Sequence, residues 1–280
     1  MGFHRFEDYA SHHFNPHLSA TRGPVIEGEY MYFRRVTKPA GSASRLHYHP
    51  NEFMVFLLQG RVHAIVGTGG RIVTPGTLIH IPSNARHRFN AKADLDYLYL
   101  KDRTWTLIGA AADEPLPEEA LSATQVARAL EAGRYPGAAK EPSRSKAISE
   151  GLGNCYYPMI GRLDAPPASA HAERWTEGAH LAFGFVESPE GHVVEQQASP
   201  HDIFAYVISG SLQAEVGGKR RLARVRRCNP RGSRKRLPVA RGAGTGALRT
   251  RTVHRAPASR NCQERRVRQL ARLESAGIDE

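Results

Sequence analysis

Three histidines in this sequence have the spacing of metal ligands. His47 and His49 lie two residues apart within residues 41–60, and His87 follows a short Ile-Pro step at 81–82. In an extended strand, residues i and i+2 point to the same face of the sheet. The first pair therefore supplies two imidazoles to one site, and His87 supplies a third from another strand. Neutral imidazoles bind iron, zinc, copper, nickel and manganese.

Several short strands must bring these histidines together. Apolar and aromatic runs bounded by Gly and Pro predict antiparallel strands at 30–37, 45–48, 53–58, 61–66, 78–81 and 96–101. His63 alternates with the apolar residues of its strand, so its side chain is expected to point outward. His80 is expected to be a structural histidine. Asn84 stands in the turn before His87 and tolerates a left-handed backbone.

The two histidine blocks resemble the two signature motifs of the cupin superfamily. The first block consists of Gly41, His47, His49, Glu52 and Gly60, and the second of Pro75-Gly76, Ile81-Pro82, His87 and Asn90. The resemblance covers roughly residues 28–100. It implies an all-β chain built on the double-stranded β-helix, or jelly-roll barrel, with a divalent metal inside.

The cupin resemblance also implies a fourth ligand, a glutamate placed before the closing glycine. That position is Phe53 in this chain, and Glu52 stands one residue early. Alternation would point Glu52 to the opposite face, unless a bulge at the turn restores it. Two metal sites stay open: one of three histidines, and one that includes Glu52. A polar core without metal is the third possibility.

The chain also contains an internal repeat with a shift of 150 residues. Residues 19–67 (the first copy) and 169–217 (the second copy) align without a gap and share 13 identical positions, among them Gly28/Gly178, Phe33/Phe183 and Gly60/Gly210. This predicts a duplicated barrel, that is, a bicupin. His47 and His49 are replaced by Gln197 and Ser199, and His201 falls in the turn. We expect the second copy to bind no metal.

The remaining segments complete the expected organisation. The N-terminal barrel spans 1–110, a helical and loop linker spans 111–150 with a helix expected from about Glu118 to Gly133, and the incomplete second cupin spans 151–218. The N-terminal histidines His4, His12, His13 and His17 lack metal-pair spacing, so residues 1–27 are expected to pack on the barrel rather than to supply ligands.

A basic tail follows at 219–280. It holds 19 Lys and Arg against 4 Asp and Glu, whereas the first 218 residues hold 20 against 23. The three interpretations are a nucleic-acid-binding tail, a disordered tail, and a shifted reading frame. The third is favoured because half a barrel leaves strand edges open. Nucleic acid is not the expected partner, since no aromatic residues interleave the basic run.

The resemblance implies metal-assisted oxidation of a small aromatic or carboxylate-type molecule, because bicupins of this kind resemble quercetin, gentisate and hydroxynaphthoate dioxygenases. Iron is then the first metal to expect, with manganese, nickel, zinc or copper as alternatives. A non-catalytic binding cupin and a metal-dependent isomerase or decarboxylase remain open. We also expect a homo-oligomer.

Composition places the protein in the cytoplasm. The three cysteines, Cys155, Cys228 and Cys262, are far apart and are expected to be reduced. No apolar run is long enough to span a membrane, and the first residues lack the apolar core of a signal peptide.

Overall fold

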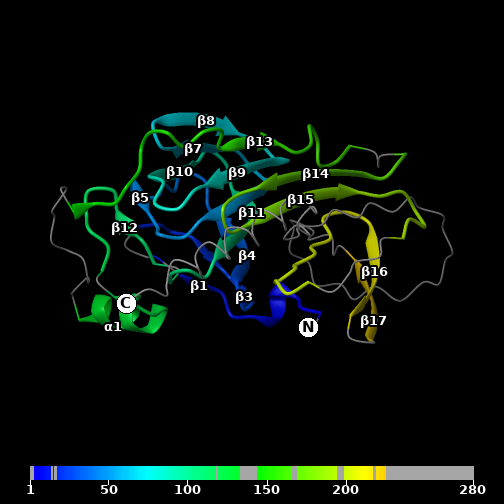
Figure 1. The fold of residues 1–280 in the computed structure, drawn as a ribbon, viewed down its shortest axis with the longest axis horizontal. Helices are drawn as coiled ribbons and strands as arrows, with labels where there is room; N and C mark the ends of the chain where they lie inside the picture. Colours follow the sequence, from blue (N-terminus) through cyan, green and yellow to red (C-terminus); the bar gives the residue numbers. More distant parts are fainter. Residues whose placement is uncertain are drawn as a thin grey trace, which may run out of the picture.

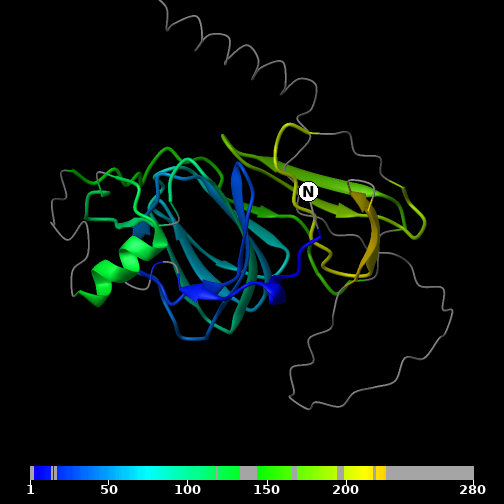
Figure 2. The same ribbon diagram turned by 90° about the horizontal axis from the view of Figure 1, so that it is seen from below.

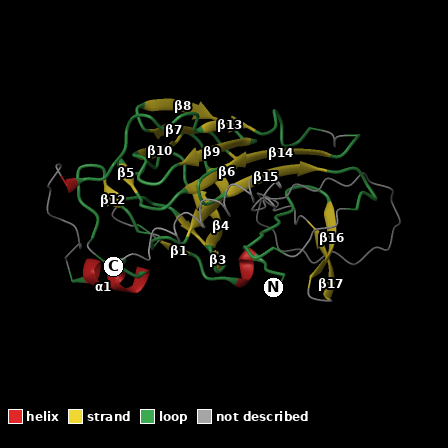
Figure 3. Cartoon of the chain, viewed as in Figure 1, coloured by secondary structure: helices red, strands yellow, loops and turns green. Residues whose placement is uncertain are grey.

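The computed structural model describes residues 3–224, apart from 14, 16–17, 107, 118, 133–143, 166–168, 194–198 and 217–218. Strands are the main regular secondary structure of these residues, and long loops connect them (Figure 3). The all-β expectation is therefore confirmed for the described part of the chain. Two sheets form the larger body, and two hairpins lie to one side of it (Figure 1).

The first sheet of the barrel has eight strands. It is made of β1 (His12–His13), β2 (Arg22–Gly23), β3 (Val25–Glu27), β4 (Met31–Lys38), β6 (Phe53–Gln59), β9 (Thr77–Ile81), β11 (Leu95–Asp102) and β13 (Tyr156–Pro158). The order is β1-β2-β4-β11-β6-β9-β13, with β3 also paired to β4, and all pairs are antiparallel.

The second sheet carries the candidate ligands. It is made of β5 (His47–Tyr48), β7 (Val62–Val66), β8 (Gly69–Val73), β10 (His87–Ala91) and β12 (Ala110–Ala111). The order is β12-β5-β10-β7-β8. Apolar side chains of both sheets share one buried core, which includes Val36 and Val55 from the first sheet and Ala64 and Phe89 from the second. The two sheets thus close around a common interior.

Strand β6 shows why the predicted 53–58 strand has no alternating pattern. Phe53, Val55 and Leu57 point into the barrel core. Met54 and Phe56 point the other way, into a second core that contains Phe183 and Phe185 of β15 (Ala182–Glu187). Both faces of the strand are covered, as an unbroken apolar run requires.

The second copy supplies that cover. Strand β14 (Ala172–Glu177) pairs with β15, and β16 (Ser211–Val216) pairs with β17 (Lys219–Arg224). Both hairpins lie beside the barrel in the two views (Figures 1 and 2). The tandem arrangement of two cupin barrels, with boundaries at 110, 150 and 218, stays a prediction, because these hairpins form only part of a barrel.

Strand β17 continues the repeat beyond the expected end at residue 218. Val216 pairs with Lys219 and Ala214 with Arg221. In the first copy, Val66 pairs with Gly69 and Ala64 with Arg71. The registers match at a shift of 150, so the hairpin geometry survives although the tail differs in composition. Residues 225–280, with Cys228 and Cys262, lie outside the described residues, whereas Cys155 is a buried free thiol.

The linker helix is shorter than expected. Helix α1 spans Ala123–Glu131 rather than starting near Glu118. The hydroxyl of Ser122 accepts a hydrogen bond from the Gln125 amide at 3.2 Å, and the Gln125 side chain accepts one from the Ser122 amide at 2.7 Å. This reciprocal capping box fixes the start of the helix at Ala123. Residues 133–143 of the predicted linker lie outside the described residues.

The N-terminal arm packs on the barrel, as expected. Phe6, in the single-turn helix η1 (Phe6–Asp8), lies between Phe33 and Tyr206 with ring centroids 5.4 and 5.9 Å away. His12 and His13 lie in β1, and the His4 ring hydrogen-bonds to Tyr9 at 2.5 Å. Within the described residues, no helix is both long and apolar enough for a membrane span.

Candidate metal centre

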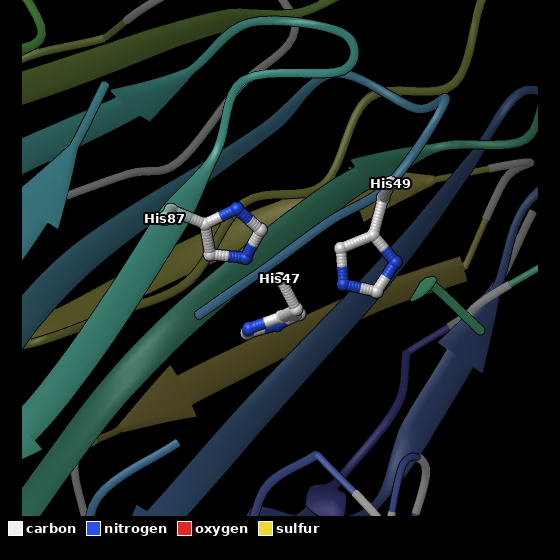
Figure 4. Close-up of side chains that lie close together, drawn as sticks. All are labelled: His47, His49 and His87. Carbon is white, nitrogen blue, oxygen red and sulfur yellow. The ribbon is translucent and has the colours of Figure 1, made fainter. Parts of the chain in front are cut away.

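The structure brings His47, His49 and His87 together inside the barrel. His47 on β5 is the direct partner of His87 on β10 in the antiparallel pairing, and His49 follows two residues after His47. One ligand nitrogen from each of the three lies within 4.8 Å of the others. All three side chains are buried, and their rings converge on one point (Figure 4).

Hydrogen bonds to the backbone orient two of the rings. Nδ1–H of His47 donates to the Arg45 carbonyl at 2.7 Å, and Nδ1–H of His87 donates to the Ala85 carbonyl at 2.9 Å. With the proton on Nδ1, the lone pair of each Nε2 is free to bind a metal. Such outer hydrogen bonds are the usual way to fix the tautomer of a metal-binding histidine.

The third ring contacts a lysine. Nδ1 of His49 lies 3.0 Å from Nζ of Lys101, which also donates to the Thr106 carbonyl at 3.1 Å. Burial lowers the pKa of Lys101 well below its ordinary value.

The electrostatics keep all three imidazoles neutral. Burial lowers the pKa of His87 to about 4. Burial, with the neighbouring cations and histidines, lowers the pKa values of His47 and His49 well below the ordinary value. Neutral imidazole is the form that coordinates metals, so the three side chains fit a divalent transition ion without further change of protonation.

A phenyl ring stands beside the histidines where the cupin pattern has a glutamate. The ring of Phe53 lies 4.8 Å from that of His87 and 5.7 Å from that of His49, both edge-on. Phe53 offers no ligand atom. The local donor set is therefore three nitrogens, which is the first of the two sites that the sequence left open.

Glu52 is placed elsewhere and is not part of the group. Its carboxylate accepts hydrogen bonds from the amides of Ala179, His180 and Leu181 at 2.6–2.8 Å, and one Oε lies 2.7 Å from Nε2 of His80. No bulge at the turn redirects it, since β6 pairs regularly with β9 from Phe53 onward. The alternation of the strand sends Glu52 to the second copy, and the alternative with Glu52 as a ligand is corrected accordingly.

The other described histidines of the barrel strands lie outside the group of three ligands, as expected. His80 is the partner of Glu52. His63 lies on β7 opposite Ile72, and its ring lies next to Gly70 on β8. In the second copy, His201 packs edge-on against Tyr30 with centroids 5.7 Å apart. Gln197 lies outside the described residues.

Sequence reasoning missed the cations of the barrel interior. Lys101 contacts His49, and the guanidinium of Arg34 lies over the Tyr99 ring at 5.2 Å. Burial lowers the pKa of Lys38 to about 8, and its Nζ donates to the Phe89 carbonyl at 2.9 Å. Arg34 and Lys38 on β4 and Lys101 on β11 occupy the alternate positions that point into the barrel. The alternation of each strand could therefore have predicted their inward orientation. Together with the histidines, these cations favour a negatively charged ligand.

Comparison with known proteins agrees with this site. Residues 34–100 match the Cupin_2 family model, described as a cupin domain. A 1-methylthio-D-xylulose 5-phosphate methylsulfurylase of Rhodospirillum rubrum is 36% identical over 111 residues, which are 38% of this chain and 66% of that protein. The chain thus spans just under two thirds of the length of this curated relative.

Two of the solved structures that the chain resembles are described as cupin domains. A cupin-2 domain from Rhodospirillum rubrum is 24% identical, with 36% of this chain and 74% of that chain covered at a TM-score of 0.31. A cupin 2 conserved barrel domain protein from Leptotrichia buccalis is 10% identical, with 71% of this chain and 72% of that chain covered at a TM-score of 0.43. Both TM-scores lie below 0.5, so the assignment rests on the family match and on the two histidine motifs. The barrel formed by residues 34–100 is therefore a cupin domain.

Proposed function

We propose that this chain is a metal-dependent enzyme that acts on a small, oxygen-rich, negatively charged molecule. The observation that carries the proposal is the group of three buried, neutral histidines with ligand nitrogens within 4.8 Å of one another. A polar core without metal would not need two Nε2 lone pairs turned free by hydrogen bonds at Nδ1. When bound, the ion would act as a Lewis acid that polarises a substrate carbonyl.

The protein residues give the substrate its charge preference. Phe53 leaves the donor set without a carboxylate, so the charge of a divalent ion is not neutralised by the protein. Lys101 lies next to His49, and the Lys38 ammonium is close enough to His47 to lower its pKa. Buried cations of this kind stabilise anionic oxygens strongly, because the interior screens charge weakly. A substrate with carboxylate, phosphate or enolate oxygens satisfies them.

The first candidate reaction is suggested by the curated relative. Its name describes a methylsulfurylase of 1-methylthio-D-xylulose 5-phosphate, which is a phosphorylated ketose with a methylthio group. A ketose offers adjacent carbonyl and hydroxyl oxygens, which bind one ion as a pair, and its phosphate matches the buried cations. The 36% identity over 111 residues favours a substrate of this class for our chain.

The second candidate is a dioxygenase for a small aromatic or carboxylate-type molecule, with iron as the metal. The three-histidine set favours it, because three protein ligands leave room for a bidentate substrate and for dioxygen as co-substrate. An isomerase or decarboxylase would need no oxygen, and a binding cupin would not turn over at all.

One set of measurements tests these possibilities. The purified chain is loaded with Fe, Mn, Ni, Zn or Cu, and bound metal is measured for the wild type, for His87→Ala and for the control His63→Ala. We expect one ion per chain in the wild type and the control, and a loss of at least a hundredfold in affinity for His87→Ala. Equal binding by all three proteins would contradict the metal site.

Substrate screening with and without oxygen then separates the reactions. Turnover of methylthio-ketose phosphates without oxygen supports the first candidate. Oxygen consumption with phenols or keto acids supports the dioxygenase. Tight metal binding without turnover of either class would favour a binding cupin.

A further inference from the structure

A groove lies on the outer face of the five-stranded sheet, separate from the histidine group. Its volume is about 820 Å³, and its wall includes Arg45, Arg86 and Arg88. Arg86 and Arg88 flank His87 in sequence. Because neighbouring side chains along a strand point to opposite faces, these two arginines point away from the interior that His87 faces. We call this cavity the outer groove.

The outer groove is positively charged. Three arginines line it, and Asp113 is the acidic residue among its described lining. Arg45 has a partner outside the lining, since its Nη2 lies 3.6 Å from an Oε of Glu114, but its side chain is still half exposed. Arg88 is exposed at the surface of β10. Two of the three guanidinium groups are thus accessible from solvent.

Arg86 is held in place at the wall of the groove. One Nη donates to the Gly67 carbonyl at 3.2 Å, which anchors the side chain. Its Nε is buried, and within the described residues it has no hydrogen-bond partner. Nε is not accessible to solvent, so any contact between Arg86 and a ligand in the groove would be made by its Nη groups.

The rest of the lining combines hydroxyl groups with small apolar side chains. The hydroxyl of Ser145 donates to the Ala112 carbonyl, and that of Ser44 accepts the Phe89 amide. Both hydroxyl groups are already engaged, so recognition of charge falls to the arginines. Leu46 and small alanines add apolar surface. The volume is that of ordinary small-molecule sites, which range from about 300 to 1,000 Å³.

We propose that the outer groove binds a phosphate group, with Arg45, Arg86 and Arg88 as its ligands. Guanidinium groups bind phosphate through paired, charge-assisted hydrogen bonds, and three of them match a dianion with several oxygens. The phosphate belongs either to free inorganic phosphate or to a small phosphate ester. The site is distinct from the histidine group because it lies on the other face of β10.

The test uses isothermal titration of the full chain with inorganic phosphate and, separately, with ribose 5-phosphate. Chelator-treated protein is used so that a metal ion in the barrel does not bind the probe. We expect saturable binding of at least one probe to the wild type and to His87→Ala. The double variant Arg45→Gln, Arg88→Gln should bind at least tenfold more weakly, whereas the control Arg61→Gln, an exposed arginine outside the groove, should bind like the wild type.

The two probes distinguish the sources of the phosphate. Binding of ribose 5-phosphate at least tenfold tighter than inorganic phosphate supports an ester, and equal affinities support free phosphate. The proposal is overturned if neither probe binds the wild type, if the double variant binds like the wild type while its urea midpoint is unchanged, or if His87→Ala abolishes binding. Arg86→Gln gives an independent check, because the variant removes a guanidinium group from the wall of the groove and should also weaken binding at least tenfold.

Discussion

Glu52 and Asp202 stand 150 residues apart, and each one caps a turn in the copy to which the other belongs. Glu52 accepts hydrogen bonds from the amides of residues 179–181 at 2.6–2.8 Å. Asp202 accepts them from the amides of residues 29–31 at 2.6–3.1 Å. The two turns are themselves 150 residues apart. This reciprocal exchange is the pattern that a duplicated unit would produce, and it explains why Glu52 is absent from the histidine group.

Replacing either carboxylate should weaken the junction without affecting metal binding. Burial opposes ionisation of Glu52, but hydrogen bonds from His80 and from the amides of the second copy hold its pKa below the ordinary value. We expect Glu52→Gln and Asp202→Asn each to lower the free energy of unfolding by about 1–3 kcal/mol, since each removes charge-assisted hydrogen bonds. Urea unfolding gives this value, and metal titration of Glu52→Gln should match the wild type. A loss of metal affinity in that variant would restore Glu52 as a ligand.

The glycines beside these carboxylates should be equally sensitive. A Cβ at Gly178 would collide with the Glu52 carboxylate, and one at Gly28 would collide with that of Asp202. Gly178→Ala should therefore destabilise the chain by at least about 1 kcal/mol, in the range of overpacked sites. Gly161→Ala is the matched control, because a Cβ there has no described atom within 4 Å. Equal thermal midpoints for the two variants would show that the junction adapts freely.

Phe53→Glu should make stability depend on metal. The ring of Phe53 faces His87 in the barrel core, and a carboxylate in its place would be buried. Without metal we expect a loss of about 2 kcal/mol or more, because a buried unpaired carboxylate is unfavourable. With Fe or Mn the new side chain becomes a fourth ligand, and the metal-induced rise in melting temperature should exceed that of the wild type. A metal-induced rise no larger than in Phe53→Leu would argue against a metal at this position.

Acid should destabilise the metal-free chain from about pH 6.5 downward. The pKa of His87 is lowered from 6.5 to about 4 by burial. Below pH 6.5, His87 of the unfolded chain binds a proton, whereas His87 of the folded chain stays neutral until about pH 4. Unfolding is therefore favoured as the pH falls. His87 alone should remove about 3 kcal/mol across this range, and the pKa values of His47 and His49 shift in the same direction. Urea unfolding at pH 7 and pH 5 should show about 2 kcal/mol of this effect from His87, and a smaller slope is expected for His87→Gln. Equal stability at the two pH values would mean that the histidines are accessible to protons.

The site was easier to predict from the sequence than its surroundings. The spacing of His47 and His49 and the turn before His87 contain the information locally, and Asn84 indeed has φ of 61°. The helix start at Ala123 was also local, in the Ser122–Gln125 pair, but the earlier prolines and glutamates concealed it. The caps at Glu52 and Asp202 were out of reach, since each depends on a turn far away in sequence. The internal repeat predicted that the two copies are structurally equivalent, but it did not predict the surface through which they contact each other.

The backbone bonds of His47 and His87 have a practical consequence. Each ring is oriented by the carbonyl two residues before it, at Arg45 and at Ala85. The histidine and the carbonyl that orients it therefore lie within the same three-residue segment. Protein engineers could transplant such segments as cassettes onto a paired strand of another barrel, because orientation would be inherited from the main chain rather than rebuilt around each ring.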